Sequence, residues 1–404
     1  MTTSAITRVS GFRAVGVTCG LKTSGNPDLA LVLSDHPCAA AAVFTTNAFK
    51  AAPVLYDMAL LERTNTLRGV VINAGNANCV TGQQGMQDAG QMARLAETAC
   101  DLPAGSIFVM STGVIGHQLP MPNIENGIRQ AAEAIQTEAG AQGLNAAQAI
   151  MTTDLVPKEA FVQATIGGQT VRLGGMAKGS GMIHPNMATM LSVIVTDAVI
   201  EPDALKAALK QAINKSFNRV TVDGDTSTND TVLVLASGAA ENMPITSTTQ
   251  PEFEPFVAAL TELSIALAKA IARDGEGATK LVEIRISGAA NEQDADLAAK
   301  TVATSPLVKT AIFGNDPNWG RVLAAIGRSG AAVEPARAWL RLGDFQLVEN
   351  GEPVDFDAVA AHNWLRSASE IVLEAGLGAG QAEAAVWTCD FSYKYVEINA
   401  EYHT

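Results

Sequence analysis

The sequence has few cysteines, few charges and no long apolar run, and each shortage excludes a class of protein. Its five cysteines form no C-x-x-C pair and lie away from histidine at ligand spacing, which argues against both a disulfide framework and a zinc site. We therefore expect no bound metal. The longest apolar run, 38–44, is too short to span a bilayer, and the first residues lack the pattern of a signal peptide. We predict a cytoplasmic protein with no membrane partner.

Positive charge is also scarce. Lys and Arg number 27 against 41 Asp and Glu, so the formal net charge is −14. A field of this sign repels the phosphodiester backbone, and no stretch rich in Lys and Arg offsets it, which excludes nucleic acid as a partner. The 404 residues are 48% hydrophobic, which is enough to bury a large core in two domains or in one large layered domain.

Short β-branched runs alternate with helical patterns along the chain. Strands are predicted at 29–34, 70–73, 107–110, 190–195, 231–237, 281–286, 385–389 and 395–398. Helices are predicted at 83–100, 123–139, 203–216, 255–273, 291–303 and 356–375. The last two strands are joined only by 390–394, too short for a parallel crossover, so they would pair antiparallel. The pattern therefore predicts an α/β fold with mixed sheets.

Several familiar catalytic motifs fail in their context. Residues 174–180 contain K-G-S where a P-loop needs G-K-[ST], and Gly376, Gly378 and Gly380 follow a predicted helix where a dinucleotide fingerprint would follow a strand. There is no H-E-x-x-H and no G-x-S-x-G, and the five histidines are scattered. A triad that depends on histidine is therefore disfavoured.

Loops dense in Asn, Thr, Gly and Asp are the unusual feature of this sequence. They cover 44–53, 73–82, 111–116, 151–154, 178–191, 221–230, 273–280 and 313–321. Any one of them could be a tight turn in which these residues supply positive φ and local caps. Eight such loops, each next to a strand or helix, favour hydrogen-bonded segments that converge on one site.

The loop at 178–191 carries the most specific signal. Gly179, Gly181 and Pro185 disfavour regular structure until a β-branched strand begins at Leu191, so Thr189 lies where a constrained loop enters a strand. Without a histidine base, a threonine can be activated by its own α-amine if the preceding peptide bond is cut. The pKa of an α-amine, about 7.7 to 8.0, suits a general base at neutral pH. On pattern alone, the simpler interpretation is favoured, in which Thr189 is a β-forming residue at the start of a strand.

Eight segments together resemble one family. They are FTTN, GNAN, STGVIG, HPNMATML, FNRVTVDGDTSTND, DGEGATK, GNDPNWGR and EINAEYHT, and with them residues 11–404 resemble the ornithine acetyltransferases, the glutamate N-acetyltransferases of arginine biosynthesis. The resemblance implies a layered αββα-type sandwich that processes itself into two chains sharing one fold. An α chain, 1–188, would carry the oxyanion-hole and substrate loops. A β chain, 189–404, would carry the N-terminal nucleophile and the C-terminal substrate contacts.

The resemblance also implies an activity and its residues. The chain would cut itself between Ala188 and Thr189, and Thr189 would then carry the acetyl group from N2-acetyl-L-ornithine to L-glutamate in a ping-pong scheme. Thr112 and Gly113 match the oxyanion hole. The residues that match the family's substrate contacts are Thr153, Lys178, Thr189, Glu276, Asn399 and Thr404. Physically, Lys178 suits a substrate carboxylate, and Glu276 suits a cationic amine or a hydrogen bond near the α-amine of Thr189.

The family further implies an α2β2 heterotetramer and no cofactor, and it leaves open whether acetyl-CoA is a second acetyl donor. Two alternatives stay open at this point. Related self-processing enzymes pass the acyl group to water and act as aminopeptidases or amidases. A protein of this fold that is never processed would only bind amino acids.

Overall fold

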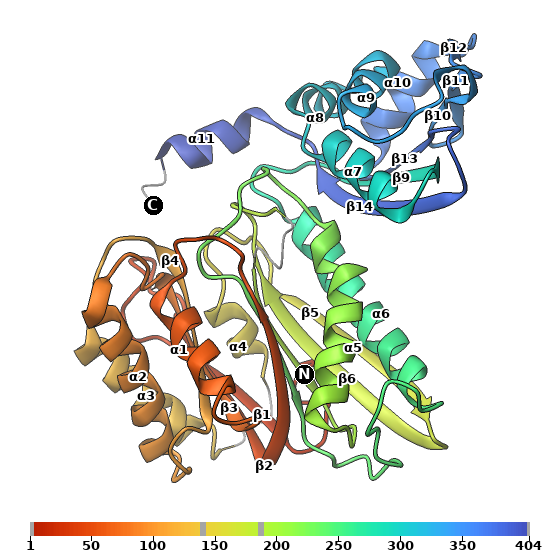
Figure 1. Cartoon of the computed structure of the whole chain (residues 1–404). Helices are drawn as coiled ribbons and strands as arrows, with labels where there is room; N and C mark the ends of the chain where they lie inside the picture. Colours follow the sequence, from red (N-terminus) through yellow and green to blue (C-terminus); the bar gives the residue numbers. More distant parts are fainter. Residues whose placement is uncertain (1–3, 138–142, 185–189, 402–404) are drawn as a thin grey trace. The chain divides into compact units, whose positions relative to one another are not determined.

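The computed structural model describes residues 4–137, 143–184 and 190–401, and the chain forms two compact units (Figure 1). The first unit holds the residues up to 218 together with 225–267, and the second holds 219–224 and the residues from 268 onward. The expected cleavage point between residues 188 and 189 therefore falls inside the first unit and does not separate the two.

The first unit contains one eight-stranded mixed sheet and most of the long helices. Its strands are β1 (Phe12–Val17), β2 (Leu29–Phe44), β3 (Thr66–Asn76), β4 (Ile107–Val114), β5 (Lys158–Ile166), β6 (Gln169–Lys178), β7 (Leu191–Thr196) and β8 (Thr231–Ala236). Its helical segments are α1 (Ala52–Leu61), α2 (Gly82–Ala99), α3 (Met121–Ala134), α4 (Leu144–Ala149), α5 (Pro202–Asn214), the 3₁₀ turn η2 (Phe217–Arg219) and α6 (Phe253–Arg273), of which η2 and α6 end in the second unit. The strand order is β4-β3-β2-β8-β7-β6-β5, with β1 also paired to β2.

The long strand β2 joins two halves of this sheet. Its first half, Leu29 to Ala39, pairs antiparallel with β3, with a register irregularity between Leu33 and Cys38. Its second half, Ala39 to Phe44, pairs antiparallel with β8. The partner of β2 thus changes near Ala39, and the β1–β4 half and the β5–β8 half continue from there as separate layers.

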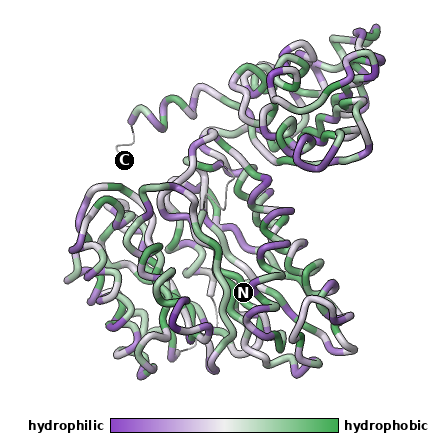
Figure 2. Tube along the Cα trace, viewed as in Figure 1, coloured by the Kyte–Doolittle hydropathy of each residue, from purple (hydrophilic) through white to green (hydrophobic). Residues whose placement is uncertain are grey.

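Successive side chains of each strand point to opposite faces of the sheet, and this alternation gives each face its own apolar layer. Leu31 of β2 and Val71 of β3 pack with α2 and α3 on the outer face. Val32 and Val70, one residue away, face the other way and share a core with Val193 of β7. The apolar side chains between the two halves therefore form the central core, with helices outside, and the expected αββα arrangement is confirmed. Figure 2 shows the hydrophobic strands inside and helices that alternate between hydrophobic and hydrophilic residues.

Helix α6 is the one helix, among the residues the structure describes, that is long and apolar enough to cross a membrane by length and composition. More than half of its apolar window is buried within the protein. Leu263 and Leu267 of this helix lie against the backbone of β6 at Gly175, as expected of a core helix.

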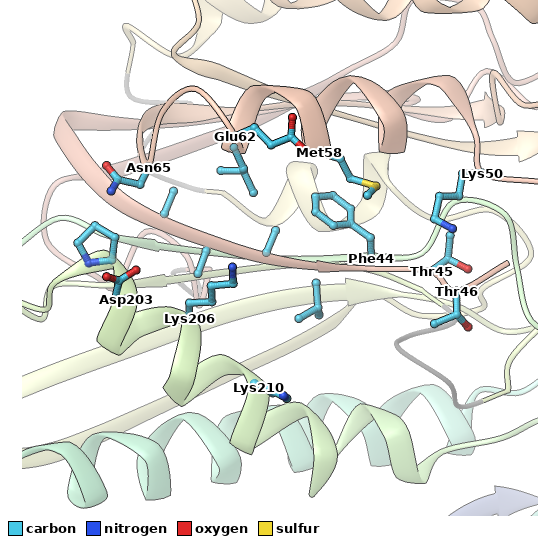
Figure 3. A pocket seen from close by; sticks show the side chains of 16 residues that line it. Phe44, Thr45, Thr46, Lys50, Met58, Glu62, Asn65, Asp203, Lys206 and Lys210 are labelled. Carbon is cyan, nitrogen blue, oxygen red and sulfur yellow. The ribbon is translucent and has the colours of Figure 1, made fainter. Parts of the chain in front are cut away.

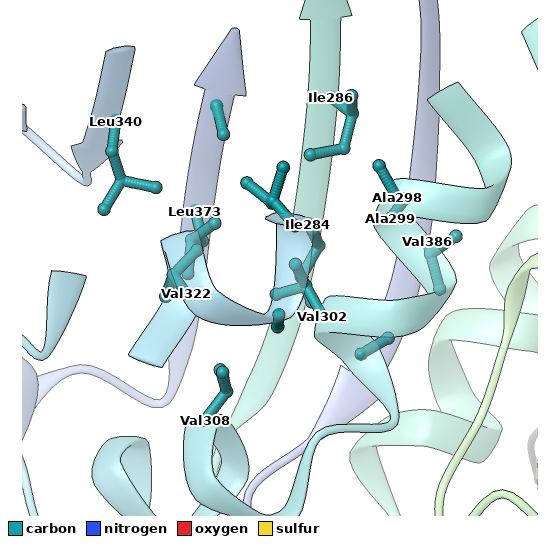
Figure 4. Packing of buried hydrophobic residues seen from close by; sticks show 14 of the residues in the cluster. Ile284, Ile286, Ala298, Ala299, Val302, Val308, Val322, Leu340, Leu373 and Val386 are labelled. Atoms are coloured by element: carbon teal, nitrogen blue, oxygen red, sulfur yellow. The ribbon is translucent and has the colours of Figure 1, made fainter. Parts of the chain in front are cut away.

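The second unit contains a six-stranded sheet in the order β12-β11-β10-β13-β9-β14. Its strands are β9 (Leu281–Ala289), β10 (Trp339–Leu342), β11 (Phe345–Glu349), β12 (Glu352–Pro353), β13 (Glu370–Gly376) and β14 (Ala382–Cys389). Its helices are α7 (Glu292–Ala303), α8 (Pro306–Phe313), α9 (Trp319–Gly327), the 3₁₀ turn η3 (Pro335–Arg337), α10 (Ala358–Ser367) and α11 (Tyr393–Glu401). Figure 4 shows how Ile284 and Ile286 of β9 pack with Ala298 and Val302 of α7 in its core.

Two predicted elements were wrong. The segment 395–398 is not a strand but part of α11, which begins where the Ser392 hydroxyl accepts a hydrogen bond from the Lys394 backbone N–H. The segment 356–375 is not one helix, because α10 ends at Ser367 and β13 then pairs parallel with β9. In β13 the burial of Ile371 and Leu373 alternates with exposure, which is the period of a strand.

Candidate active site

Six strand ends meet at one edge of the first unit. The paired residues Gly75 and Gly113 lie at the ends of the parallel strands β3 and β4. On the other half, Lys178 at the end of β6 pairs with Leu191 at the start of β7. Leu191 in turn pairs with Thr231 at the start of β8, opposite the end of β2. The segments that follow or precede these ends are the polar loops that the sequence singled out.

The predicted oxyanion residues lie at the end of β4. Gly113 has φ of +133°, and a Cβ there would lie 2.3 Å from the carbonyl carbon of Gly75 and 2.5 Å from the backbone nitrogen of Asn76. Only glycine fits at this position without displacing β3. Thr112 precedes it and is only 8% exposed. The close approach of the two strand ends therefore fixes the backbone on which both residues sit.

An asparagine network holds these strand ends together. The Asn229 side-chain amide donates to the carbonyl oxygens of Ala77, at 2.6 Å, and Ser111, at 2.8 Å. The Ser111 hydroxyl donates to the Asn73 side-chain oxygen at 2.6 Å. Buried polar groups that are fully paired rigidify a site, so the loop before β8 is anchored to the residue preceding Thr112.

Lys178 joins the two halves of the unit at this edge. Its ammonium Nζ donates a hydrogen bond to the Thr112 Oγ1 at 3.1 Å, although 66 residues separate them. Both side chains are buried, at 8% exposure. Because this bond uses a lone pair of the hydroxyl oxygen, the hydroxyl hydrogen of Thr112 remains a donor for another group. The cation beside it makes that hydrogen a stronger donor to a developing negative charge.

Asp154 fixes the start of the loop that follows Lys178. Its carboxylate accepts hydrogen bonds from the Lys158 ammonium at 2.6 Å, the Gly179 backbone N–H at 2.7 Å and the Thr152 backbone N–H at 3.0 Å. Burial alone would raise its pKa, but the charges of Lys178 and Lys158 and these hydrogen bonds outweigh it and lower the pKa of Asp154 to about 2. Asp154 is therefore ionised at neutral pH and ties its own bend to Gly179.

Thr153 lies in this bend, half-buried, directly before Asp154. It is thus brought to the same strand edge as Lys178, through the bond between the Asp154 carboxylate and the Gly179 backbone N–H. No hydrogen bond joins Thr153 to Lys178 among the described residues.

The nucleophile predicted at Thr189, and Ala188 before it, lie outside the described residues. The next residue, Met190, is buried, and its carbonyl oxygen accepts a hydrogen bond from the Thr231 backbone N–H at 2.9 Å. Asp230, which directly precedes Thr231, is fully buried. Burial raises the pKa of Asp230 well above its usual range, against the opposing effects of Ser227, Lys178, Thr45 and the Met190 backbone N–H. The Asp230 carboxyl group thus contacts the backbone that follows residue 189, and its burial favours the neutral form.

Glu276 and Asn399 are brought together in the second unit. The Asn399 side-chain amide donates to the Glu276 Oε2 at 2.8 Å, and Glu276 is only 7% exposed. The loop of Glu276 is tied to the segment before α11, because the Asp390 carboxylate accepts from the backbone N–H groups of Thr279 and Lys280 at 2.8 and 3.0 Å. Thr404 lies outside the described residues.

The sequence therefore located two of the clusters but missed three of their buried polar residues. Asp154, Asn229 and Asp230 were not singled out, although each lies in a polar loop that was. The available signal was their place at the ends of the segments 151–154 and 221–230. The GNDPNWGR segment runs from the end of α8 into the first turn of α9 in the second unit and belongs to neither cluster.

Comparison with known proteins places the chain in a family. The ArgJ family model matches residues 13–404. The arginine biosynthesis bifunctional protein ArgJ of Symbiobacterium thermophilum is 53% identical over 401 residues, which cover 99% of this chain and 98% of the relative. The protein of the same name from Synechococcus sp. is 46% identical over 407 residues, with 99% and 97% covered. This chain belongs to the ArgJ family.

The structure of an ArgJ family member has also been solved. A crystal structure of arginine biosynthesis bifunctional protein ArgJ from Bacillus halodurans is 46% identical, with a TM-score of 0.52, and covers 53% of this chain and 100% of its own. Membership of the ArgJ family confirms two predictions from the sequence, namely the family resemblance and the fold class. It also confirms the class of enzyme, an acyltransferase of arginine biosynthesis.

Proposed function

We propose that this ArgJ family chain cuts itself between Ala188 and Thr189 and then transfers the acetyl group of N2-acetyl-L-ornithine to L-glutamate. The observation that carries the proposal is the hydrogen bond from the Lys178 ammonium to the Thr112 hydroxyl, beside Gly113. This polarised hydroxyl and the adjacent backbone N–H are the two donors that an oxyanion needs. They lie at the strand edge where β7 begins, two residues after Thr189.

The first half-reaction forms an acetyl ester. The free α-amine of Thr189 takes the proton of its own hydroxyl while the hydroxyl oxygen attacks the acetyl carbonyl carbon of acetylornithine. The oxyanion formed accepts hydrogen bonds from the Thr112 hydroxyl and the Gly113 N–H. As the C–N bond breaks, the Thr189 ammonium returns the proton to the leaving amine, and ornithine departs.

The second half-reaction is the same chemistry with a new acceptor. The neutral amine of glutamate attacks the ester carbonyl, its proton passes to the Thr189 amine, and the threonine oxygen leaves as a hydroxyl after regaining that proton. Both substrates carry an α-carboxylate, and Lys178 is a buried cation beside the oxyanion donors. Thr153, Glu276, Asn399 and Thr404 remain predicted substrate contacts.

Two features support self-cleavage into chains that stay together. Lys178 and Leu191, on either side of the cut, pair in adjacent strands of one sheet, so both products would keep their places in the core. The solved chain from B. halodurans matches over its whole length yet covers 53% of this chain, the share that residues 189–404 make up. We propose accordingly an α chain of residues 1–188 and a β chain of residues 189–404.

An acetylornithine assay with and without glutamate tests the reaction. Formation of acetylglutamate that depends on Thr189 supports it. Release of acetate at the same rate without glutamate would instead identify an amidase. A chain that stays uncut and only binds amino acids would give neither product.

We further propose acetyl-CoA as a second acetyl donor, since the relatives are named bifunctional. Acetylation of glutamate by acetyl-CoA, measured with and without the hydroxyl of Thr189, tests this. We propose no other cofactor and no metal. Sedimentation of the processed protein tests the α2β2 heterotetramer, and fractionation of the host cell tests the cytoplasmic location.

A further inference from the structure

Strand β2 has an open edge in its second half. It pairs with β3 only as far as Ala39, whereas its pairing with β8 continues to Phe44. From Ala40 onward no strand among the described residues pairs with the edge that β3 has left. Unpaired strand edges are templates for another strand.

Two backbone hydrogen bonds show which backbone groups point to this edge. The Ala40 N–H donates to the Asn65 carbonyl oxygen, on the β3 side, at 2.9 Å, and the Thr45 N–H donates to the Asp230 carbonyl oxygen, on the β8 side, at 2.9 Å. Alternate residues of a strand point to the same edge, so the N–H and C=O groups of Ala42 and Phe44 point to the β3 side. Ala42 and Phe44 are half-buried, whereas Val43 between them is buried.

A groove of about 830 Å³ lies along this edge. We call it the β2 groove. Its walls are residues 40–46 of β2 and the loop after it, the C-terminal half of α1, and α5 from Pro202 to Lys210. In Figure 3 the Phe44 ring points toward Met58 of α1, and Lys206 and Lys210 extend from α5 on the other side of the strand. A strand added to the edge would thus have one face toward each helix.

The two walls differ in chemistry. The α1 wall offers the apolar side chains of Met58 and Leu61, with Glu62 directly after the helix. The α5 wall offers the exposed Lys206 and Lys210 together with the exposed Asp203. None of the ion pairs among the described residues involves either lysine. Lys50 adds a third cation at the Thr46 end. This basic wall stands out on a chain whose net charge is −14.

We propose that the β2 groove binds an extended peptide of a partner protein in which acidic and apolar residues alternate. The backbone of the peptide pairs with the N–H and C=O groups of Ala42 and Phe44. Because side chains alternate between the faces of a strand, the apolar ones contact α1 and the acidic ones contact the lysines of α5. The edge from Ala40 to Phe44 is about 16 Å long at about 3.3 Å per residue, so it takes about five residues of peptide.

Fluorescence anisotropy with the full-length protein and the labelled peptide acetyl-(Glu-Val)₃-amide tests the proposal. A peptide of the same composition with three Glu followed by three Val is the control ligand. The variants are Ala42→Pro, which removes one amide N–H of the open edge, and the double charge reversal Lys206→Glu with Lys210→Glu. Lys215→Glu, an exposed lysine after α5 and outside the groove, is the matched control.

We expect the wild type to bind the alternating peptide more tightly than the block peptide. The double reversal should weaken binding by about tenfold or more at low salt, and Lys215→Glu by less than about twofold. Ala42→Pro should abolish binding without lowering the melting temperature, because the lost N–H points away from β8.

Three results would overturn the proposal. They are equal affinity for both peptides, unchanged affinity in Ala42→Pro, and no binding to the wild type. If the wild type does not bind the peptide, a lower sedimentation coefficient for Ala42→Pro than for the wild type would show that a second copy of this chain covers the edge.

Discussion

Replacing Thr112 with valine removes one hydroxyl group from the proposed oxyanion hole while keeping the shape of the side chain. Thr112→Val leaves the backbone at Gly113 in place, because the close contact with Gly75 and not the hydroxyl fixes that glycine. The Lys178 ammonium loses its acceptor at 3.1 Å. The change therefore removes the hydroxyl together with its hydrogen bond to Lys178.

The magnitude follows from the role of the group. Loss of one preorganised oxyanion donor costs about 10² to 10³ in kcat, or about 2.7 to 4 kcal/mol of transition-state stabilisation. The ground state should be little affected, so KM for acetylornithine should change by less than about threefold. The fall in kcat/KM is then carried by kcat.

A double-mutant cycle with Lys178→Met separates the two roles of the lysine. If Lys178 acts only by polarising the Thr112 hydroxyl, the double variant is no slower than Thr112→Val. If Lys178 also binds a substrate carboxylate, the double variant has a higher KM as well. Steady-state rates of acetylglutamate formation, with melting temperatures as the control for folding, provide the measurement. A kcat of Thr112→Val within threefold of the wild type would refute the oxyanion assignment.

Three further predictions concern the groups around this centre. Lowering the pKa of Asp154 from 3.8 to about 2 contributes about 2 kcal/mol to the free energy of unfolding. This contribution is present above pH 4 and is lost as the pH falls through 2. The stability difference between the wild type and Asp154→Asn, measured by denaturant titration, should therefore shrink over that range. The raised pKa of Asp230 lowers the stability of the folded chain as the pH rises above the pKa that this group has in the unfolded chain. Asp230→Asn should therefore be as stable as the wild type at pH 4 and at least as stable at pH 7. A lower stability of Asp230→Asn at pH 7 would contradict a protonated carboxyl group. Deleting 402–404 should spare self-cleavage and the melting temperature but reduce acetyl transfer, and unchanged rates would exclude a role for Thr404.

Local pattern sufficed to predict the strand that carries the proposed oxyanion residues. The apolar run at 107–110 predicted β4, and the polar residues after it placed Thr112 and Gly113 at its end. The contact with Lys178 could not be predicted, because β6 was not. Gly174 in β6 lowers strand propensity, yet a Cβ there would lie 2.0 Å from the carbonyl oxygen of Ala5, so the glycine serves a packing contact with the N-terminal segment.

Burial likewise determined two features that the sequence did not predict, the direction of two pKa shifts and the conformation of residues 395–398. Asp154 and Asp230 are both aspartates in polar loops, but lysines surround the first and the second is enclosed with its charge poorly compensated, so the pKa values of the two shift in opposite directions. The alternating residues at 395–398 have no partner strand among the described residues and lie in α11, where no residue is buried. Such outcomes depend on residues distant in sequence, which a local pattern does not encode.

Intact-mass spectrometry of the purified protein, before and after incubation with N2-acetylornithine alone, tests the central claim most directly. The account predicts two chains that meet at residues 188 and 189. It also predicts that the chain beginning with Thr189 gains the mass of one acetyl group, which glutamate then removes. A single uncut chain that nevertheless forms acetylglutamate, or an acetyl group located on any other residue, would contradict the account.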